Sequence, residues 1–412
     1  MPIMRSIRTL HTLVVISLLT ACSGPELPVF GEVVPLPVPA GENTLGPYLA
    51  AEPGGPVVLS WMYREDTGAT LRFSSLGDDG WQSANDVVTD ARMFVNWADL
   101  PSVRRLDNDL WVAHWLSKSA DSTYAYDVLL AYSPDQGRSW QEAIRPHTDG
   151  TPTEHGFVSM QAQGDSTALL WLDGRKTAIE PTADPTATSM TLRAAVVSPD
   201  GKISDEQLVD DIVCDCCQTD VAISSDGPIA VYRNRTAGEI RDIYITRHTG
   251  DGWEPGVPIA NDGWKIAGCP VNGPSIDADG DLVAIAWFSA ADNEPIVRAV
   301  VSTNAGRTFS KPVVIASGRV SGHVGIAALG SESAAVSWVE SGNQGKNAIN
   351  IRAVNASGLV GPVTTVGHSE LLRIHPQLAR TNNDLVLAWT DAADTTTRVI
   401  SARVPVPGGG HR

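Results

Sequence analysis

Residues 110–115, Leu-Trp-Val-Ala-His-Trp, form a short apolar run that ends in tryptophan and leads into a polar turn. Fragments of this kind recur seven times in the 412-residue chain, at intervals of 51 to 61 residues. A period of this length is typical of repeat architectures, in which a single unit cannot bury its own apolar face. The sequence therefore predicts one supersecondary unit used seven times. The aromatic residues that end the fragments are Trp61, Trp115, Trp171, Tyr232, Trp287, Trp338 and Trp389.

Residues 100–146 show the content of one unit. Runs rich in β-forming residues at 101–103, 110–115 and 126–132 predict three strands, and a fourth follows the turn at 133–140. Four antiparallel strands joined by Gly, Asp and Asn turns make a propeller blade. We therefore predict an all-β fold, a β-propeller of seven four-stranded antiparallel blades, with six blades as the alternative. The other units begin near Pro47, Gly156, Gln218, Asn272, His323 and His375.

The last unit predicts how the ring closes. Residues 375–404 supply only three strands, whereas residues 32–38 at the other end of the chain read like the fourth strand at 312–315. An N-terminal strand that completes the last blade would remove two exposed strand edges. The predicted propeller is thus one domain over residues 31–406, followed by a flexible tail at 407–412.

The N-terminus reads as an export signal. Arg5 and Arg8 precede a short apolar run at 13–19, and Leu19-Thr20-Ala21-Cys22 resembles a bacterial lipobox. The resemblance implies a signal peptide at 1–21, lipidation of Cys22, and a tether over 22–30 that anchors an outer-membrane lipoprotein on its periplasmic or surface face. An ordinary secretory signal with a chance cysteine is the alternative.

Charge excludes one class of partner. The chain carries 30 basic and 47 acidic residues, and its first 21 residues hold two arginines and no acid. Nucleic acids are bound by basic surfaces, so the acidity argues against a nucleic-acid partner. Solubility is a sufficient reason for the acidity. We expect a monomer attached to the membrane only through its lipid anchor.

The turn at 133–140 matches an Asp-box, with Ser133, Asp135, Gly137 and Trp140 at the motif positions. The carboxylate is expected to accept backbone N–H groups, Gly137 to adopt a positive φ, and Trp140 to pack under the hairpin. A degenerate copy lies at 302–309. With these turns the chain resembles the sialidase-like (BNR/Asp-box) superfamily, and most closely bacterial proteins described as "sialidase family protein". Segments that carry the closer resemblance are 124–127, 154–159, 171–175, 214–219 and 268–274.

The blade template gathers the unusual side chains on one face. The turn after the second strand and the beginning of the first strand emerge on the same side of a blade. In the sialidase-like superfamily that side holds the ligand site. The predicted ligand-binding residues are Arg64, His155, Arg175, Arg233, Arg235 and Asn272. His323 and His375 lie at the beginning of blades six and seven. Each could line the channel or be a hydrogen-bonded packing residue.

The resemblance also implies catalytic roles. Sialidases clamp the substrate carboxylate with arginines and use a tyrosine nucleophile, a glutamate partner and an aspartic acid. Here the nucleophile would be Tyr126, with Tyr63 and Tyr124 as alternatives, its partner Glu154, and the acid Asp99 or Asp173. These roles would make the protein an exo-α-sialidase-type glycoside hydrolase acting on an acidic glycan. Two departures speak against this activity: the arginine motif of the first blade is missing, and sialidases have six blades. A non-enzymatic scaffold that binds an envelope protein is the alternative.

Four cysteines precede blades four and five: Cys214, Cys216, Cys217 and Cys269. An exported protein meets an oxidising compartment, so disulfides are expected, with Cys269 bridged to Cys217 or Cys216. The alternative is a thiolate site for copper or zinc, or a redox site, built from all four sulfurs. No other cofactor is predicted.

Overall fold

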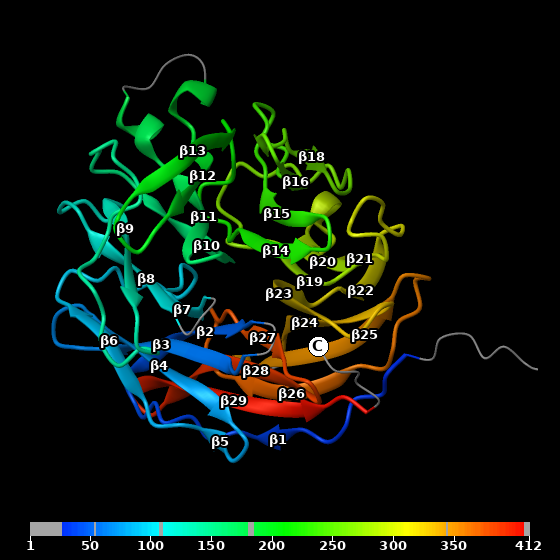
Figure 1. Cartoon of the computed structure of the whole chain (residues 1–412). Helices are drawn as coiled ribbons and strands as arrows, with labels where there is room; N and C mark the ends of the chain where they lie inside the picture. The colour runs from blue at the N-terminus through cyan, green and yellow to red at the C-terminus, as the bar shows by residue number, and fades with distance from the viewer. Residues whose placement is uncertain (1–26, 53–54, 107–109, 180–184, 343–344, 408–412) are drawn as a thin grey trace, which may run out of the picture.

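A computed structural model of the chain describes residues 27–52, 55–106, 110–179, 185–342 and 345–407 (Figure 1). Within these ranges seven antiparallel sheets form a ring, which confirms the predicted β-propeller and its seven blades. The predicted signal peptide, Cys22, the first residues of the predicted tether and the end of the predicted tail lie outside the described residues. In the described ranges no helix has the length and apolar character needed to cross a bilayer.

The first four blades follow one another along the chain, each beginning with its innermost strand. Blade 1 comprises β2 (Thr44–Ala51), β3 (Val57–Arg64), β4 (Ala69–Gly77), β5 (Gly80–Trp81) and β6 (Asn85–Asp90). Blade 2 comprises β7 (Ser102–Arg105), β8 (Trp111–Lys118) and β9 (Tyr126–Ser133). Blade 3 comprises β10 (His155–Gln163), β11 (Ser166–Asp173), β12 (Thr191–Val197) and β13 (Ile203–Asp210). Blade 4 comprises β14 (Asp220–Ser224), β15 (Gly227–Arg233), β16 (Ile243–Thr249), β17 (Gly252–Trp253) and β18 (Val257–Pro258).

The remaining blades complete the ring, and the described loops of the propeller include three short 3₁₀ helices. Blade 5 comprises β19 (Ser275–Asp279), β20 (Leu282–Ser289), β21 (Ile296–Ser302) and β22 (Val313–Ser317). Blade 6 comprises β23 (Val320–Ala328), β24 (Ser333–Ser341), β25 (Asn347–Asn355) and β26 (Thr364–Ser369). Blade 7 comprises β27 (Gln377–Arg380), β28 (Asp384–Ala393), β29 (Thr396–Pro405) and β1 (Val34–Pro35). The 3₁₀ helices are η2 (Arg175–Ala178), η3 (Pro185–Thr188) and η4 (Ala291–Asn293).

Ring closure follows the sequence prediction. Strand β1 pairs antiparallel with β29, with Val34 opposite Arg403, and Figure 1 shows the blue N-terminal strand beside the red C-terminal one. Blade 2 departs from the four-stranded template, because its sheet has only the three strands β7, β8 and β9 in the described residues. In place of the fourth strand, Ile144 pairs with Leu130 on β9.

The repeat aromatics hold the blades together. All seven lie on the second strand of their blade and are 0 to 4 % exposed. The described residues contain seven apolar clusters, and each cluster joins two neighbouring blades around the ring. A blade therefore buries its apolar faces only against its neighbours, as the period implied.

The innermost strands surround an axial cavity of about 500 Å³. Neighbouring innermost strands belong to different sheets, so side chains of one blade bond the backbone of the next. Gln161 donates to the carbonyl of Val221 at 2.6 Å, Asp220 accepts the N–H of Ile276 at 2.9 Å, and Asp277 accepts that of Ala328 at 2.8 Å. Much of the polar lining of the channel thus connects one blade to the next.

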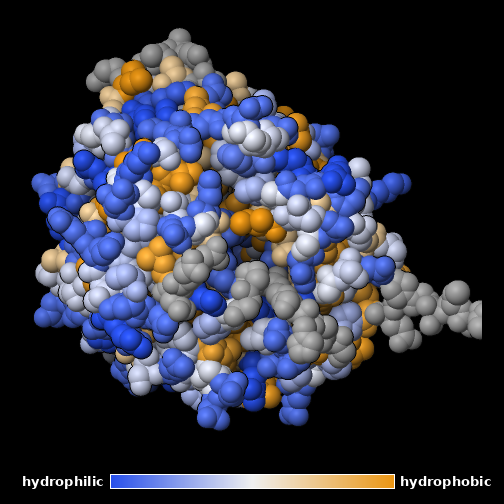
Figure 2. All heavy atoms as spheres, viewed as in Figure 1, coloured by the Kyte–Doolittle hydropathy of each residue, from blue (hydrophilic) through white to orange (hydrophobic). Residues whose placement is uncertain are grey.

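The Asp-box turn has the expected local geometry. Asp135 accepts the N–H of Ser139 at 2.8 Å, Ser133 Oγ accepts that of Gly137 at 2.7 Å, and Gly137 has a φ of 81°. The ring of Trp140 packs edge-on against Phe73 of blade 1. Figure 2 shows the face viewed in Figure 1 as mainly hydrophilic, with apolar side chains in scattered patches.

Candidate functional site between blades 2 and 3

Three predicted catalytic residues meet on one face of the ring. We call this the proximal face, defined as the face at which the innermost strands begin. Tyr126 starts β9, Glu154 directly precedes β10, and Asp99 lies in the loop before β7. The Tyr126 hydroxyl donates to Glu154 Oε1 at 2.6 Å and lies 3.3 Å from Asp99 Oδ2. Asp99 also lines the axial cavity, so the group adjoins the channel.

The backbone of β10 is shaped to fit these side chains. A Cβ on Gly156 would stand 2.2 Å from Asp99 Oδ2 and 2.9 Å from Tyr126 Cε2, so only glycine fits there. Phe157 adopts a φ of 51°, in the left-handed region, and its N–H donates to Asp99 Oδ1 at 2.8 Å. A strained conformation that holds a carboxyl group in place is a feature of functional sites.

The carboxyl groups of Asp99 and Glu154 both hold their protons more tightly than usual. Burial raises the pKa of Asp99 from 3.8 to about 8, against the lowering effect of the Phe157 N–H. Burial also raises the pKa of Glu154 from 4.5 to about 7, while the hydrogen bond from Tyr126 lowers it and the charge of Asp215 raises it. Burial and the two neighbouring carboxyl groups raise the pKa of Tyr126. A proton can therefore be held or released within this group near neutral pH.

Access to solvent distinguishes the three groups. Tyr126 and Asp99 are each 1 % exposed, and the ring of Phe94 stacks on that of Tyr126 at 4.1 Å between centroids. Glu154 is only half-buried. The predicted nucleophile Tyr126 is thus covered in this conformation, and Glu154 is the member of the group that a ligand can reach.

Asp173 does not join this group. It is fully buried at the end of β11, where its oxygens accept two bonds from the Arg175 guanidinium, at 2.7 and 2.8 Å, and one from Trp171 Nε1 at 2.8 Å. Burial raises its pKa, but the bonds from Arg175 and the charges of His155 and Arg175 outweigh burial and lower it. An ionised, fully bonded carboxylate cannot act as the predicted acid.

His155 lies in the same ion network. Its Nδ1 is 3.3 Å from the carbonyl oxygen of Tyr126, and its Nε2 is 3.3 Å from Asp149 Oδ1 and 3.8 Å from Asp173 Oδ2. The ring stacks on His147 at 3.8 Å between centroids. His155 is 0 % exposed, so it supports the site from beneath and does not contact a ligand.

The side chains around His155 include the ligand types that a metal ion needs, but their geometry does not suit one. Asp127, His147 and His155 form one possible ligand set, and Asp149, His155 and Asp173 another. In the second set the Asp173 oxygens already accept bonds from Arg175 and Trp171. In the first set the two imidazole planes are within 8° of parallel, so one ion cannot lie in both ring planes.

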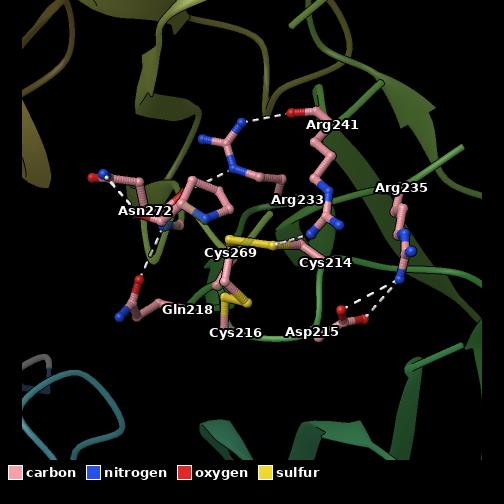
Figure 3. The surroundings of a disulfide bond; sticks show 12 residues. Cys214, Asp215, Cys216, Gln218, Arg233, Arg235, Arg241, Cys269 and Asn272 are labelled. Carbon is pink, nitrogen blue, oxygen red and sulfur yellow. Dashed lines mark hydrogen bonds and ion pairs between the residues drawn. A yellow bond between two sulfur atoms is a disulfide. The ribbon is translucent and has the colours of Figure 1, made fainter. Parts of the chain in front are cut away.

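The predicted arginine clamp does not assemble. Arg233 is 2 % exposed and donates to the carbonyls of Asn272, Arg241 and Phe288 at 2.6–2.8 Å, so it is not available to a ligand (Figure 3). Figure 3 also shows Arg235 directed at Asp215, at 3.3 Å, and this arginine bonds Glu239 as well.

The other two predicted ligand-binding residues also lie apart from the group. Arg64 is exposed at the end of β3, and among the described residues it forms no ion pair with the other candidates. Asn272 Oδ1 accepts the N–H of His323 at 2.8 Å. This bond ties blade 5 to blade 6 and occupies the amide that was predicted to bind a ligand.

The four cysteines form two disulfides, Cys214–Cys217 and Cys216–Cys269. Cys216–Cys269 is one of the two expected bridges, whereas the pairing of Cys217 with Cys269 is wrong, because Cys217 is bonded to Cys214. Sulfurs in disulfides do not supply the thiolates of the alternative copper or zinc site. The second bridge joins the loops before blades 4 and 5.

We expect loss of the Cys216–Cys269 disulfide to destabilise the fold. The bridge closes a loop of 53 residues, for which chain entropy predicts up to about 4 kcal/mol and typical measurements give about 2–4 kcal/mol. Urea unfolding of a Cys216→Ser/Cys269→Ser variant should show this loss. The matched Cys214→Ser/Cys217→Ser variant, which opens a three-residue separation, should lose less. Equal losses would contradict the entropic argument.

Asp99 should make the fold less stable as pH rises. Its pKa in the folded chain, about 8, lies above the ordinary value of 3.8. The folded state therefore binds more protons between these values, and the free energy of unfolding falls by up to about 1.4 kcal/mol per pH unit. An Asp99→Asn variant should give a flatter dependence between pH 5 and 8 in urea unfolding. Parallel curves for the two proteins would show that Asp99 does not titrate in this way.

Sequence reasoning missed two residues of the proximal face, Trp97 and Arg373. They lie two positions before Asp99 and His375, which were singled out. The only signal was this proximity to the beginning of a blade. The ring of Trp97 contacts that of His323 of blade 6 at 5.4 Å, and the guanidinium of Arg373 lies 5.9 Å from the Trp97 ring.

No protein-family model matches this chain, and no curated protein sequence matches it. Solved structures do resemble it. A protein of unknown function from Dyadobacter fermentans gives a TM-score of 0.51 at 11% identity, covering 92% of this chain and 98% of the other. The polysaccharide lyase Uly1 gives 0.50 at 8% identity, with 88% and 90% covered. A Trypanosoma rangeli sialidase in complex with the inhibitor DANA gives 0.45 at 10% identity, with 80% and 57% covered. The first two of these likenesses support the fold described above over nearly the whole chain, and the fold alone.

Proposed function

We propose that this protein binds and cleaves an acidic glycan on its proximal face, with Glu154 as the general acid/base. The observation that carries the proposal is the 2.6 Å hydrogen bond from Tyr126 to a half-exposed Glu154 whose pKa is about 7. A general acid/base works best when its pKa lies near the working pH. The similar fold of the polysaccharide lyase Uly1 supports a glycan as the ligand.

The charge of the group suits an anionic ligand. At neutral pH Asp99 is mostly protonated, since its pKa is about 8, and Glu154 is about half protonated. A neutral carboxyl group can donate a hydrogen bond and does not repel a sugar carboxylate. In its protonated form Glu154 would supply the proton to the departing sugar oxygen, and Tyr126 would hold the resulting carboxylate by its hydrogen bond.

Activity assays test the proposal. The mature chain is incubated with sialyllactose and with oligogalacturonate at pH 7.5, and free sialic acid, new reducing ends and unsaturated products are measured. Release from either glycan supports the proposal, and the product shows whether hydrolysis or elimination occurred. The absence of both turnover and calorimetric binding would overturn the proposal and favour the non-enzymatic scaffold.

We also propose that the protein is anchored in the outer membrane through lipidated Cys22, as the lipobox-like sequence indicates. A Cys22→Ser variant expressed in a Gram-negative host should move from the membrane fraction to the soluble fraction. It should also lose labelling with a radioactive fatty acid. Unchanged membrane association of the variant would contradict lipid anchoring.

A further inference from the structure

A second group of side chains lies on the proximal face, and we call it the mouth cluster. It consists of Trp97, His323, Arg373 and His375, which come from the loops and strands that begin blades 2, 6 and 7. The Trp97 and His323 rings meet edge-on at 5.4 Å, and the His323 and His375 rings lie 5.7 Å apart. Side chains from opposite parts of the ring thus meet over the channel.

Trp97 is held in place from below and remains partly exposed. It packs against the apolar cluster shared by blades 3 and 4, and the carbonyl of the next residue, Ala98, accepts a bond from Gln218 Nε2 at 2.9 Å. Asp99 and His375 continue from the mouth cluster into the wall of the axial cavity. The indole is therefore a fixed aromatic surface beside the Tyr126–Glu154 group.

The histidines of the mouth cluster offer polar atoms that the protein does not use. His323 Nδ1 is buried without a hydrogen-bond partner in the described part of the chain. His375 Nδ1 lies 2.7 Å from Gln377 Nε2 and accepts its hydrogen, which leaves the ring proton on Nε2. Burial lowers the pKa of His323 to about 3 and that of His375 to about 4, so both rings are neutral at pH 7.

Arg373 supplies a cation that is not neutralised. It is exposed and forms no ion pair with any carboxylate in the ranges that the structure describes, while its guanidinium lies 5.9 Å from the Trp97 ring. In contrast, Arg175 and Arg235 are bound to carboxylates, and Arg233 to backbone carbonyls. Unlike these three arginines, Arg373 can therefore pair with an incoming carboxylate.

We propose that the mouth cluster is the subsite for a carboxylated sugar residue of the glycan. The apolar face of the sugar ring packs on Trp97, its carboxylate pairs with Arg373, and one of its hydroxyl groups accepts the Nε2 proton of His375. A mainly aromatic surface with a few well-placed polar groups is the usual composition of a small-ligand site. This inference rests on the proposed function, which it extends from an acid/base group to the recognition of one charged sugar.

Calorimetric titration of the mature chain with sialyllactose, trigalacturonate and neutral lactose tests the subsite. Arg373→Gln should weaken binding of the two carboxylated sugars about tenfold or more, as expected for one charge-assisted pair. Binding of lactose should not change. Trp97→Leu should weaken all three ligands, and Trp97→Phe should restore most of the affinity. Arg403→Gln, an exposed arginine on β29 of the same blade, is the matched control and should bind as the wild type does.

The outcomes separate this inference from the proposed function. A wild-type protein that binds or cleaves a carboxylated glycan, with Arg373→Gln and Trp97→Leu binding equally well, overturns the subsite and leaves the proposed function intact. If Arg373→Gln and Arg403→Gln weaken the binding of carboxylated sugars equally, the subsite is also overturned. A wild-type protein that binds neither carboxylated glycan overturns both.

Discussion

Replacement of Glu154 by glutamine is expected to lower kcat/KM for the cleaved glycan by about 10²–10⁴-fold, the usual contribution of a positioned general acid/base. Glutamine keeps the shape of the side chain and can still accept the 2.6 Å bond from Tyr126, but it cannot transfer a proton. The fold should therefore persist, and circular dichroism with urea unfolding would confirm this. An activity within threefold of the wild type would remove Glu154 from the mechanism.

The Tyr126→Phe variant provides the matched test, because it changes the proton affinity of Glu154 and not its presence. The hydrogen bond from Tyr126 lowers the pKa of Glu154, so its loss should raise that pKa. The limb of the pH–rate profile that reports Glu154 should move to higher pH, with a smaller loss of activity than in Glu154→Gln. A purely structural role for Tyr126 would lower the rate without moving the limb.

Replacement of Asp173 by alanine is expected to be the most destabilising single change, at about 3–5 kcal/mol. Removal of one partner from a buried ion pair leaves the other charge uncompensated. Here Arg175 would lose two of its three guanidinium bonds and keep the one to Glu206, and Trp171 Nε1 would lose its acceptor within the core. Urea unfolding followed by tryptophan fluorescence measures the change in the free energy of unfolding.

Two further variants serve as an intermediate case and a control for the Asp173→Ala measurement. Asp173→Asn keeps acceptors for Trp171 and Arg175 but removes the charge, so its loss of stability should be intermediate. Asp121→Ala, at an exposed position, should change stability by less than about 0.5 kcal/mol. If Asp173→Ala were no worse than Asp121→Ala, the ion network would not contribute to folding.

The fold could be predicted from the sequence because it depends on a repeated local pattern. Each repeat aromatic lies on a second strand, and a blade cannot bury that strand without neighbours on both sides. The count of seven aromatics therefore gave the count of blades, and the three-stranded last unit indicated closure by the N-terminal strand. The regular fourth strand predicted for blade 2 is wrong, and residues 141–146 after its Asp-box favour a strand only weakly, since Ile144 is their one β-branched residue and Pro146 follows it.

The site could be predicted only in part. Asp99, Tyr126 and Glu154 precede or begin strands of adjacent blades, so their positions on the template already placed them on one face. The arginines failed for a different reason: a cation binds a ligand only if no neighbour has neutralised it. Arg175, Arg233 and Arg235 are occupied by Asp173, by backbone carbonyls and by Asp215 with Glu239. Those partners are set by packing that sequence spacing does not reveal.

The sequence alone thus determined the seven-bladed ring, its closure and the face on which unusual residues gather, because periodicity and strand order are properties of the chain itself. Tertiary structure decided which cysteines pair, which acid of the group a ligand can reach, and which of the predicted arginines are neutralised by their neighbours. Disulfide pairing, burial and charge neutralisation depend on distances between blades, and Trp97 and Arg373, 276 positions apart in the sequence, become neighbours only when the ring has closed.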